Sequence, residues 1–114
     1  MISILNISEL EEGTSRGIEI NNRYLFAVKK DEQIYVYWNR CPHLGTPLEW
    51  EEHRFLNQDG ALIQCSTHGA LFRIDDGECL VGPCQGKYLQ AVPFTLVEDM
   101  IQVEDQLLQP PTIT

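Results

Sequence analysis

Basic residues are scarce in this sequence, and long apolar segments are missing from it. Eight Lys and Arg stand against 17 Asp and Glu, which gives a formal net charge of -9 at pH 7. This negative charge argues against binding to nucleic acid, whose phosphates attract cations, and against docking on anionic lipid. No apolar segment approaches the about 20 residues of a membrane-spanning helix. The acidity suits an electropositive surface on a partner protein, or serves only to keep the protein soluble.

Residues 1–10 contain no basic residue and no long apolar segment, so they do not resemble a secretory signal. We therefore expect a cytoplasmic protein, in a compartment where thiols stay reduced. The sequence also lacks a glycine-rich dinucleotide motif, a phosphate loop and a Gly-x-Ser-x-Gly nucleophile motif. Its 114 residues fit a single domain, residues 1–114, with no room for a separate substrate domain. We expect the chain itself to catalyse no bond change.

Strand signals dominate what is present. Alternating apolar residues, or β-branched and aromatic residues, predict short strands separated by turn residues. The predicted strands are residues 2–7, 17–20, 24–29, 33–38, 55–56, 61–64, 70–74, 78–80, 89–94 and 100–103. A single helical turn is expected at residues 8–12, opening at Ser8. Short strands with regular turns predict an all-β fold, an antiparallel sandwich or barrel.

The segment from residue 40 to residue 86 differs from its flanks because it holds all four cysteines and all three histidines. We predict that it forms a loop-rich, cluster-binding subdomain. The flanking residues 1–39 and 87–105 are then expected to form a basal β subdomain. Residues 106–114 contain two consecutive prolines and are expected to form a tail.

Two short motifs in this segment each combine one cysteine with one histidine. The first is CPHLG at residues 41–45, and the second is CSTHG at residues 65–69. Thiolates are soft, charged ligands that suit ferric iron and sulfide, and a neutral imidazole adds a metal bond without adding charge. The glycine that ends each motif lets the backbone turn close to a metal centre. The pattern favours a metal centre held by two thiolates and two imidazoles.

These motifs resemble those of the Rieske family, whose pattern is Cys-x-His, a gap of similar length, and Cys-x-x-His followed by glycine. The resemblance implies a Rieske-like fold and one 2Fe-2S cluster. It also implies that Cys41 and Cys65 bind one iron and that His43 and His68 bind the other. The imidazole edges would then face solvent and give electrons a way in and out.

Other positions resemble some members of the family and differ from others. Gly82-Pro83 resembles the proline loop that covers the cluster. Thr46 and Thr67 stand where high-potential members carry a disulfide-bonded cysteine pair. Ala70 and Phe72 stand where those members carry hydroxyls that hydrogen-bond the cluster. With fewer hydrogen-bond donors to the cluster, its reduced state is less stabilised. The resemblance therefore implies a low reduction potential, on the order of −150 mV.

The resemblance therefore implies a soluble ferredoxin of the kind that feeds oxygenases. It would carry one electron at a time from a reductase to a terminal oxidoreductase such as an oxygenase. Both partners would bind through electropositive surfaces. A redox-sensing or regulatory module is one alternative, and a fixed small subunit of a larger oxidoreductase is another.

The individual residues also allow other interpretations. A set of two cysteines and two histidines can hold structural zinc, but zinc motifs usually separate the cysteines from the histidines, whereas each motif here mixes them. A metal-free, degenerate site is disfavoured because all four ligands are present. Cys79 and Cys84 flank the proline loop and are either buried packing residues or a structural or regulatory disulfide. His53 lies in a charged stretch and is expected to be a solvated loop residue, not a ligand.

Overall fold

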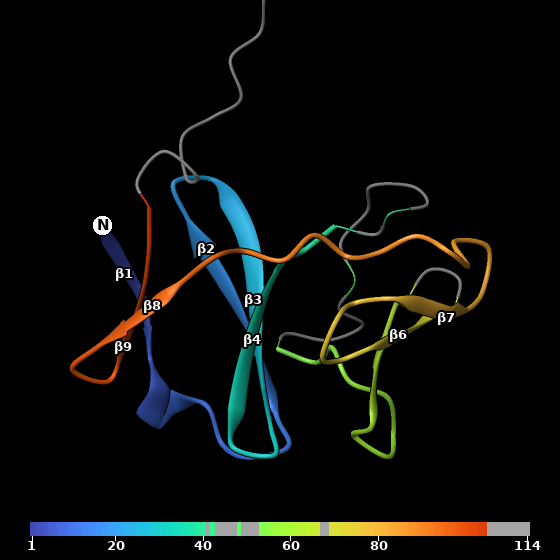
Figure 1. The fold of residues 1–114 in the computed structure, drawn as a ribbon, viewed down its shortest axis with the longest axis horizontal. Coiled ribbons are helices and arrows are strands. Elements are labelled where there is room, and N and C mark those ends of the chain that lie inside the picture. The colour runs from blue at the N-terminus through green and yellow to red at the C-terminus, as the bar shows by residue number, and fades with distance from the viewer. Residues whose placement is uncertain (41, 43–47, 49–52, 67–68, 105–114) are drawn as a thin grey trace, which may run out of the picture.

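The chain folds into three small antiparallel sheets that lie side by side (Figure 1). The computed structural model describes residues 1–40, 42, 48, 53–66 and 69–104. The central sheet has the order β2-β3-β4, the second β1-β9-β8 and the third β5-β6-β7. The strands are β1 (Ile2–Asn6), β2 (Ser15–Ile20), β3 (Arg23–Lys30), β4 (Gln33–Trp38), β5 (Leu62–Gln64), β6 (Leu71–Arg73), β7 (Cys79–Val81), β8 (Thr95–Val97) and β9 (Met100–Val103). The predicted all-β antiparallel class is confirmed.

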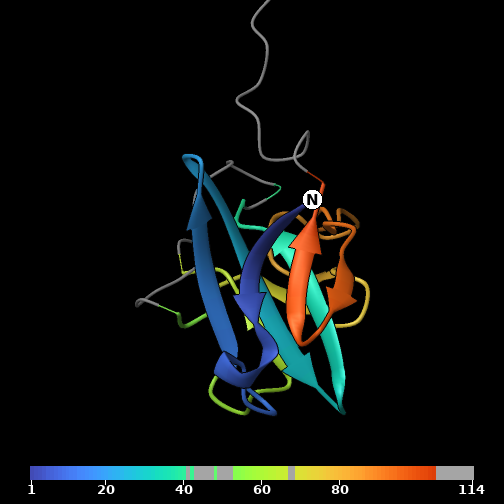
Figure 2. The same ribbon diagram turned by 90° about the vertical axis from the view of Figure 1, so that its left-hand side faces the viewer.

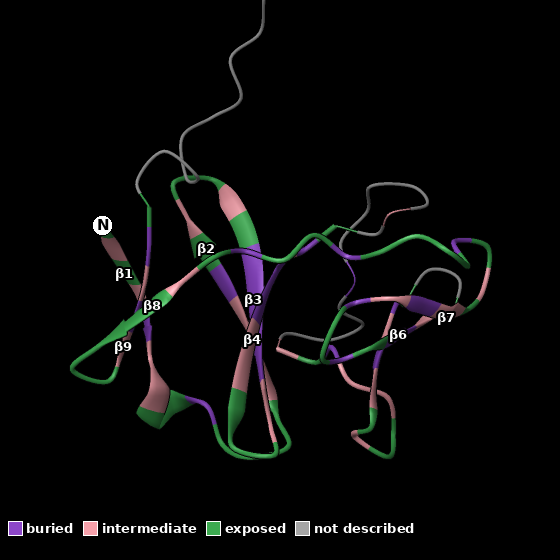
Figure 3. Ribbon diagram, in the orientation of Figure 1, coloured by how far each residue is buried: buried purple, intermediate pink, exposed green. Residues whose placement is uncertain are grey.

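The central strand β3 is buried on both of its faces. Leu25 and Ala27 belong to one hydrophobic core, and Phe26 and Val28 belong to the other. Successive side chains of a strand point to opposite faces of the sheet, so neighbours along β3 enter different cores. Double burial explains why this part of the sequence is a continuous apolar run and does not alternate. The buried colour of β3 in Figure 3 shows the same point.

Each core lies between the central sheet and one flanking sheet. The basal core, on the side of β1-β9-β8, comprises Leu5, Leu10, Ile18, Leu25, Ala27, Val36, Val92, Ile101 and Val103. The loop-side core comprises Phe26, Val28, Tyr37, Leu48, Phe55, Ile63, Cys65, Ala70, Phe72, Ile74, Cys79, Cys84 and Leu89. Its centre is a stacked pair, Phe26 and Phe55, whose ring centroids are 4.3 Å apart. All three cysteines that the structure describes lie in the loop-side core.

Tight two-residue turns connect the hairpins. Residues 21–22, 31–32 and 98–99 all have positive φ values, between 50° and 68°, as a type I′ turn requires. At the second of these turns, the Glu12 carboxylate accepts hydrogen bonds from the backbone N–H groups of Asp31 (2.8 Å) and Glu32 (2.9 Å). The bond from Glu32 and then that from Asp31 lower the pKa of Glu12.

Figure 2 shows β1 and β9 side by side in front of the central sheet.

Most predicted strands are confirmed within two residues at either end, and two are wrong. Residues 55–56 form a single bridge, between Leu56 and Ile63. Residues 89–94 form one bridge, between Ala91 and Tyr37, and the regular strand begins only at Thr95. Pairing with β4 is limited to the bonds from Trp38 N–H to the Gln90 carbonyl oxygen (3.0 Å) and from Val92 N–H to the Val36 carbonyl oxygen (2.8 Å). Pro93 follows directly, and its ring fixes φ at about −65°, away from the about −140° of an antiparallel strand, which disfavours a longer strand here.

The predicted helical turn is present but shifted. It is a 3-10 turn, η1 (Ile7–Glu9), and its cap is Asn6, whose side chain accepts a hydrogen bond from the backbone N–H of Ser8. The expectation that the turn opens at Ser8 is therefore wrong, because Asn6 supplies the capping oxygen. Among the described residues, no helix has the length and hydrophobicity needed to cross a lipid bilayer.

A buried hydrogen bond joins the central sheet to the third sheet. The Tyr37 hydroxyl donates to the carbonyl oxygen of Ile74 over 2.5 Å. Burial, and then the negative charge of Asp76, raise the pKa of Tyr37, so the hydroxyl keeps its proton and remains a donor. Gly77 lies against the same ring, and a Cβ atom there would lie 3.0 Å from Cε1 of Tyr37. Tyr37 therefore fixes the position of the turn between β6 and β7.

Replacing Tyr37 by Phe should lower the free energy of unfolding by about 1–2 kcal/mol, because the buried carbonyl of Ile74 loses its donor. Urea unfolding of the two proteins would measure the difference. Tyr24→Phe is the matched control, since Tyr24 is 53% exposed. Equal stability of the Tyr37→Phe variant and the parent chain would contradict this role.

Candidate metal centre

The second motif forms a tight loop between β5 and β6. The backbone N–H of Cys65 donates to the carbonyl oxygen of Ala70 over 2.8 Å, and the N–H of Gly69 donates to the carbonyl oxygen of Cys65 over 2.9 Å. Gly69 has a φ of +66°, a conformation that glycine adopts without strain. Among the described residues, no atom outside its own chain neighbours lies within 4 Å of the position that its Cβ would take. The backbone conformation at this position therefore favours glycine.

Cys65 is the one predicted ligand that the structure describes. Its side chain is fully buried in the loop-side core and is not part of a disulfide. The neighbours Ala70 and Phe72 are fully buried as well, and neither carries a hydroxyl. An unoxidised, buried thiol in an apolar setting fits a thiolate ligand whose charge is neutralised by a bound metal.

The first motif is anchored at both of its ends. Before it, the backbone N–H of Asn39 donates to the carbonyl oxygen of Tyr24 over 2.9 Å. After it, the backbone N–H of Leu48 donates to the side-chain oxygen Oδ1 of Asn39 over 2.8 Å. Asn39 is buried and Leu48 is fully buried, so this bond is protected from water. The Asn39 side chain thus holds Asn39 and Leu48, which lie on either side of the first motif in the sequence, next to each other.

One further hydrogen bond joins the two motif loops. The backbone N–H of Ser66 donates to the carbonyl oxygen of Leu48 over 2.9 Å. Ser66 directly follows Cys65, and Leu48 lies three residues beyond the end of the first motif. Leu48, which follows the first motif, and Ser66, which belongs to the second, are therefore held next to each other, as a shared metal centre requires.

The predicted proline loop lies on the second motif. Gly82 has a φ of +114°, and a Cβ atom there would lie 3.0 Å from both Cα and Cβ of Ala70. Only glycine permits this close approach, since any larger residue would push the loop away from Ala70. The packing places residues 82–83 beside the loop that contains Cys65.

Three of the four predicted ligands, Cys41, His43 and His68, lie outside the described residues. The full ligand set therefore stays a prediction. Sequence reasoning missed Asn39 and Leu48, which organise the first loop. A buried asparagine next to a ligand motif is a weak signal by itself, because its partner is nine residues away in the sequence.

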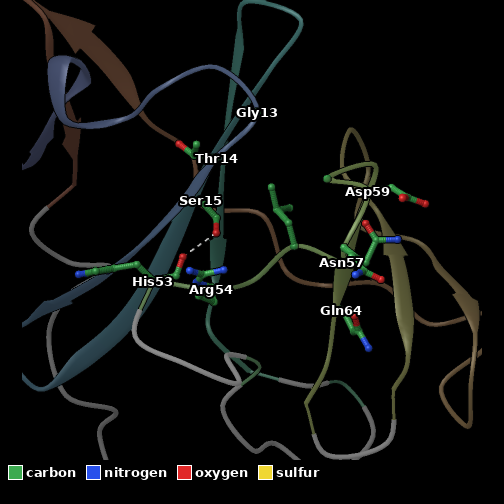
Figure 4. Close-up of a pocket in the computed structure, with 11 residues that line it drawn as sticks. Gly13, Thr14, Ser15, His53, Arg54, Asn57, Asp59 and Gln64 are labelled. Carbon is green, nitrogen blue, oxygen red and sulfur yellow. Dashed lines mark hydrogen bonds between the residues drawn. The ribbon is translucent and has the colours of Figure 1, made fainter.

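His53 is not the solvated loop residue that we expected. It is partly buried, and its Nδ1 accepts a hydrogen bond from the backbone N–H of Gly17 over 3.0 Å. Its carbonyl oxygen accepts one from the Ser15 hydroxyl over 2.8 Å, drawn as a dashed line in Figure 4. His53 attaches the connection between the motifs to β2 and so has a structural role, consistent with the expectation that it is not a ligand.

Figure 4 also shows a polar cleft next to His53. Its volume is about 790 Å³, and it lies between residues 13–15 and residues 53–64. Cys65 does not line it.

Comparisons with known proteins agree with this geometry. The family model for the Rieske [2Fe-2S] domain matches residues 1–101. A search of curated protein sequences finds no significant match. Among solved structures, a ferredoxin of Sphingomonas yanoikuyae B1 is similar with a TM-score of 0.73 and 22% identity, covering 91% of this chain and 97% of that one.

Two further similar structures come from carbazole 1,9a-dioxygenase. A chain from the complex of reduced oxygenase and oxidised ferredoxin has a TM-score of 0.70 and 22% identity, covering 90% of this chain and 100% of that one. A terminal oxygenase from Novosphingobium sp. KA1 has a TM-score of 0.65 and 20% identity, covering 98% of this chain but 31% of that one. At these identities the similarity shows a shared fold.

Replacing Asn39 by Ala should weaken the first loop, because the buried N–H of Leu48 loses its acceptor at a cost of about 1–3 kcal/mol. We expect iron to be lost severalfold faster to a chelator, measured by the fading of the visible absorbance. Asn57→Ala is the matched control. The Asn57 side-chain oxygen accepts hydrogen bonds from the backbone N–H groups of Ala61 and Leu62, at the start of β5, whereas Cys65 follows the end of that strand. Equal rates of iron loss from both variants would show that Asn39 has no specific role.

Proposed function

Because this chain belongs to the Rieske 2Fe-2S domain family, we propose that it is a ferredoxin, a carrier of single electrons between a reductase and a terminal oxidoreductase such as an oxygenase. The family match over residues 1–101 is the observation that carries the proposal. A domain that occupies nearly the whole chain leaves little sequence for a separate catalytic site. The chain would therefore bind and release electrons without changing covalent bonds.

The residues suited to hold the cluster are Cys41 and Cys65 on one iron and His43 and His68 on the other. When bound, the cluster supplies a one-electron couple. The chain contributes a buried thiol at Cys65 and two loops fastened together through Leu48. It also excludes water from the thiolate side of the site, where Ala70 and Phe72 are fully buried.

The proposal includes a reduction potential at the low end of the Rieske range. Hydrogen bonds to the cluster stabilise its reduced state and raise the potential. Ala70 and Phe72 offer no hydroxyl next to Cys65, so that stabilisation is reduced. We therefore expect a potential on the order of −150 mV.

The similar structures support an oxygenase as the electron acceptor. One of them is a complex between an oxygenase and its ferredoxin, and that ferredoxin-sized chain is matched over its full length. We propose that this chain docks on a comparable acceptor and receives its electrons from a separate reductase in the cytoplasm. The net charge of -9 favours electropositive surfaces on both partners.

Replacing His43 or His68 by Cys should add a negative charge at the cluster and so lower its reduction potential. Electron paramagnetic resonance of the reduced protein would show a shift of the low average g value that is typical of Rieske clusters. His53→Asn is the matched control, since His53 is the one histidine of the chain outside the two motifs. If both cysteine variants kept the parent spectrum, the ligand assignment would be wrong.

Electron transfer from the reductase should slow severalfold as salt is raised, because salt screens the attraction between an acidic carrier and an electropositive partner. Stopped-flow absorbance of cluster reduction at limiting reductase would measure the rate. The cluster potential, recorded at each salt concentration, is the control for direct effects of salt on the cluster. A rate that rises with salt would contradict electropositive docking.

A further inference from the structure

Two cysteines outside the ligand motifs lie in contact with each other. Cys79 is the first residue of β7, and Cys84 follows the proline loop. Their Sγ atoms are 2.6 Å apart, and both side chains are almost completely buried, with 1% and 0% exposure. A disulfide bond is about 2.05 Å long, so the two sulfur atoms lie roughly half an ångström beyond bonding distance.

Cys84 is the only buried residue within the exposed segment 83–88, all of which the structure describes. The segment is held to β7 by a backbone bond from Cys79 N–H to the carbonyl oxygen of Lys87 (2.9 Å) and by the Cys84 side chain. The segment includes Pro83, whose neighbour Gly82 packs on Ala70 beside Cys65. The contact between Cys79 and Cys84 therefore anchors the loop that covers the second motif.

The hydrogen bonds assign different roles to the two thiols. Cys79 Sγ donates to the carbonyl oxygen of Val81 over 3.4 Å, which leaves the Cys84 thiol as the donor to Cys79 Sγ. Burial, followed by the hydrogen bond to Cys79, raises the pKa of Cys84 to about 12. While the loop is closed, Cys84 is therefore a neutral thiol at pH 7 and reacts slowly, because the thiolate is the nucleophile.

We propose that Cys79 and Cys84 form a reversible disulfide that closes residues 80–83 into a covalent ring and fixes the proline loop on the second motif. The oxidant is a small-molecule disulfide such as oxidised glutathione. When the exposed segment opens, the Cys84 thiolate attacks this disulfide and releases one small thiol. Cys79 then attacks the mixed disulfide and releases a second small thiol. Two protein thiols are oxidised, and one small disulfide is reduced to two thiols.

This disulfide is distinct from the one found in high-potential Rieske proteins. In this chain Thr46 and Thr67 occupy the positions of that cysteine pair, so the two motif loops are not linked there. A bond between Cys79 and Cys84 would instead stabilise the proline loop, which both residues flank.

Trypsin gives a direct test on the full, cluster-loaded protein. The chain should be equilibrated anaerobically with mixtures of reduced and oxidised glutathione, quenched in acid, alkylated in denaturant and digested. Cleavage after Arg73 and Lys87 places both cysteines in the peptide 74–87, while Cys41 and Cys65 fall in the peptides 41–54 and 55–73. As the mixture becomes oxidising, we expect the peptide 74–87 to lose both alkyl labels. Its mass should then be that of the unlabelled dithiol peptide less two hydrogens. Two labels in the most oxidising mixture would overturn the proposal.

Hydrogen exchange of the same samples tests the effect on the loop. Amides of residues 83–88 should exchange severalfold more slowly in the disulfide form, whereas those of the β2-β3 hairpin should not change. Equal exchange of residues 83–88 in both forms would refute the role of the bond in fixing the loop.

Two variants test the order of attack. Cys79→Ser should trap glutathione on Cys84. Cys84→Ser should leave Cys79 free of glutathione, because Cys79 is paired in β7 and lies outside the segment that opens. Circular dichroism establishes that each variant is folded. Glutathione trapped on Cys79 alone would contradict the proposed order. The parent protein decides the main question even if a variant does not fold.

Discussion

A short relay of hydrogen bonds through Leu48 holds the two motif loops together. Its N–H donates to the Asn39 side chain, and its carbonyl oxygen accepts from Ser66, while its own side chain is fully buried. Neither loop contains regular secondary structure among its described residues, so the loops depend on such bonds for a fixed geometry. The relay connects the end of β4 to the residue that follows Cys65.

The central sheet makes this arrangement rigid. Because β3 is buried on both faces, the basal core and the loop-side core are built on the same strand. The stacked rings of Phe26 and Phe55 pack the connection between the motifs against β3. Electron transfer benefits from a scaffold that moves little, because less reorganisation accompanies each change of charge.

The sequence predicts most strands well, because the signals for strands and turns are local. The signal for the candidate ligands is local too, and their assignment stays a prediction. Hairpin strands carry their own alternation and turn residues, and each ligand motif spans five residues. Contacts between distant segments are harder to predict. The bond between Asn39 and Leu48 and the role of His53 as an acceptor for Gly17 leave no periodic pattern in the sequence. The failed strand at residues 89–94 has a local cause, since the fixed φ of Pro93 disfavours a regular strand.

The pairing of β1 with β9 has a consequence for how this fold can be used. Ile2 lies opposite Val103 in the register, so the first and last strands meet in one sheet, and in Figure 1 the central sheet separates them from the third sheet. The chain therefore enters β1 and leaves β9 on the side of the central sheet that lies away from the third sheet. The domain can therefore be inserted into a longer protein without the added polypeptide covering the third sheet.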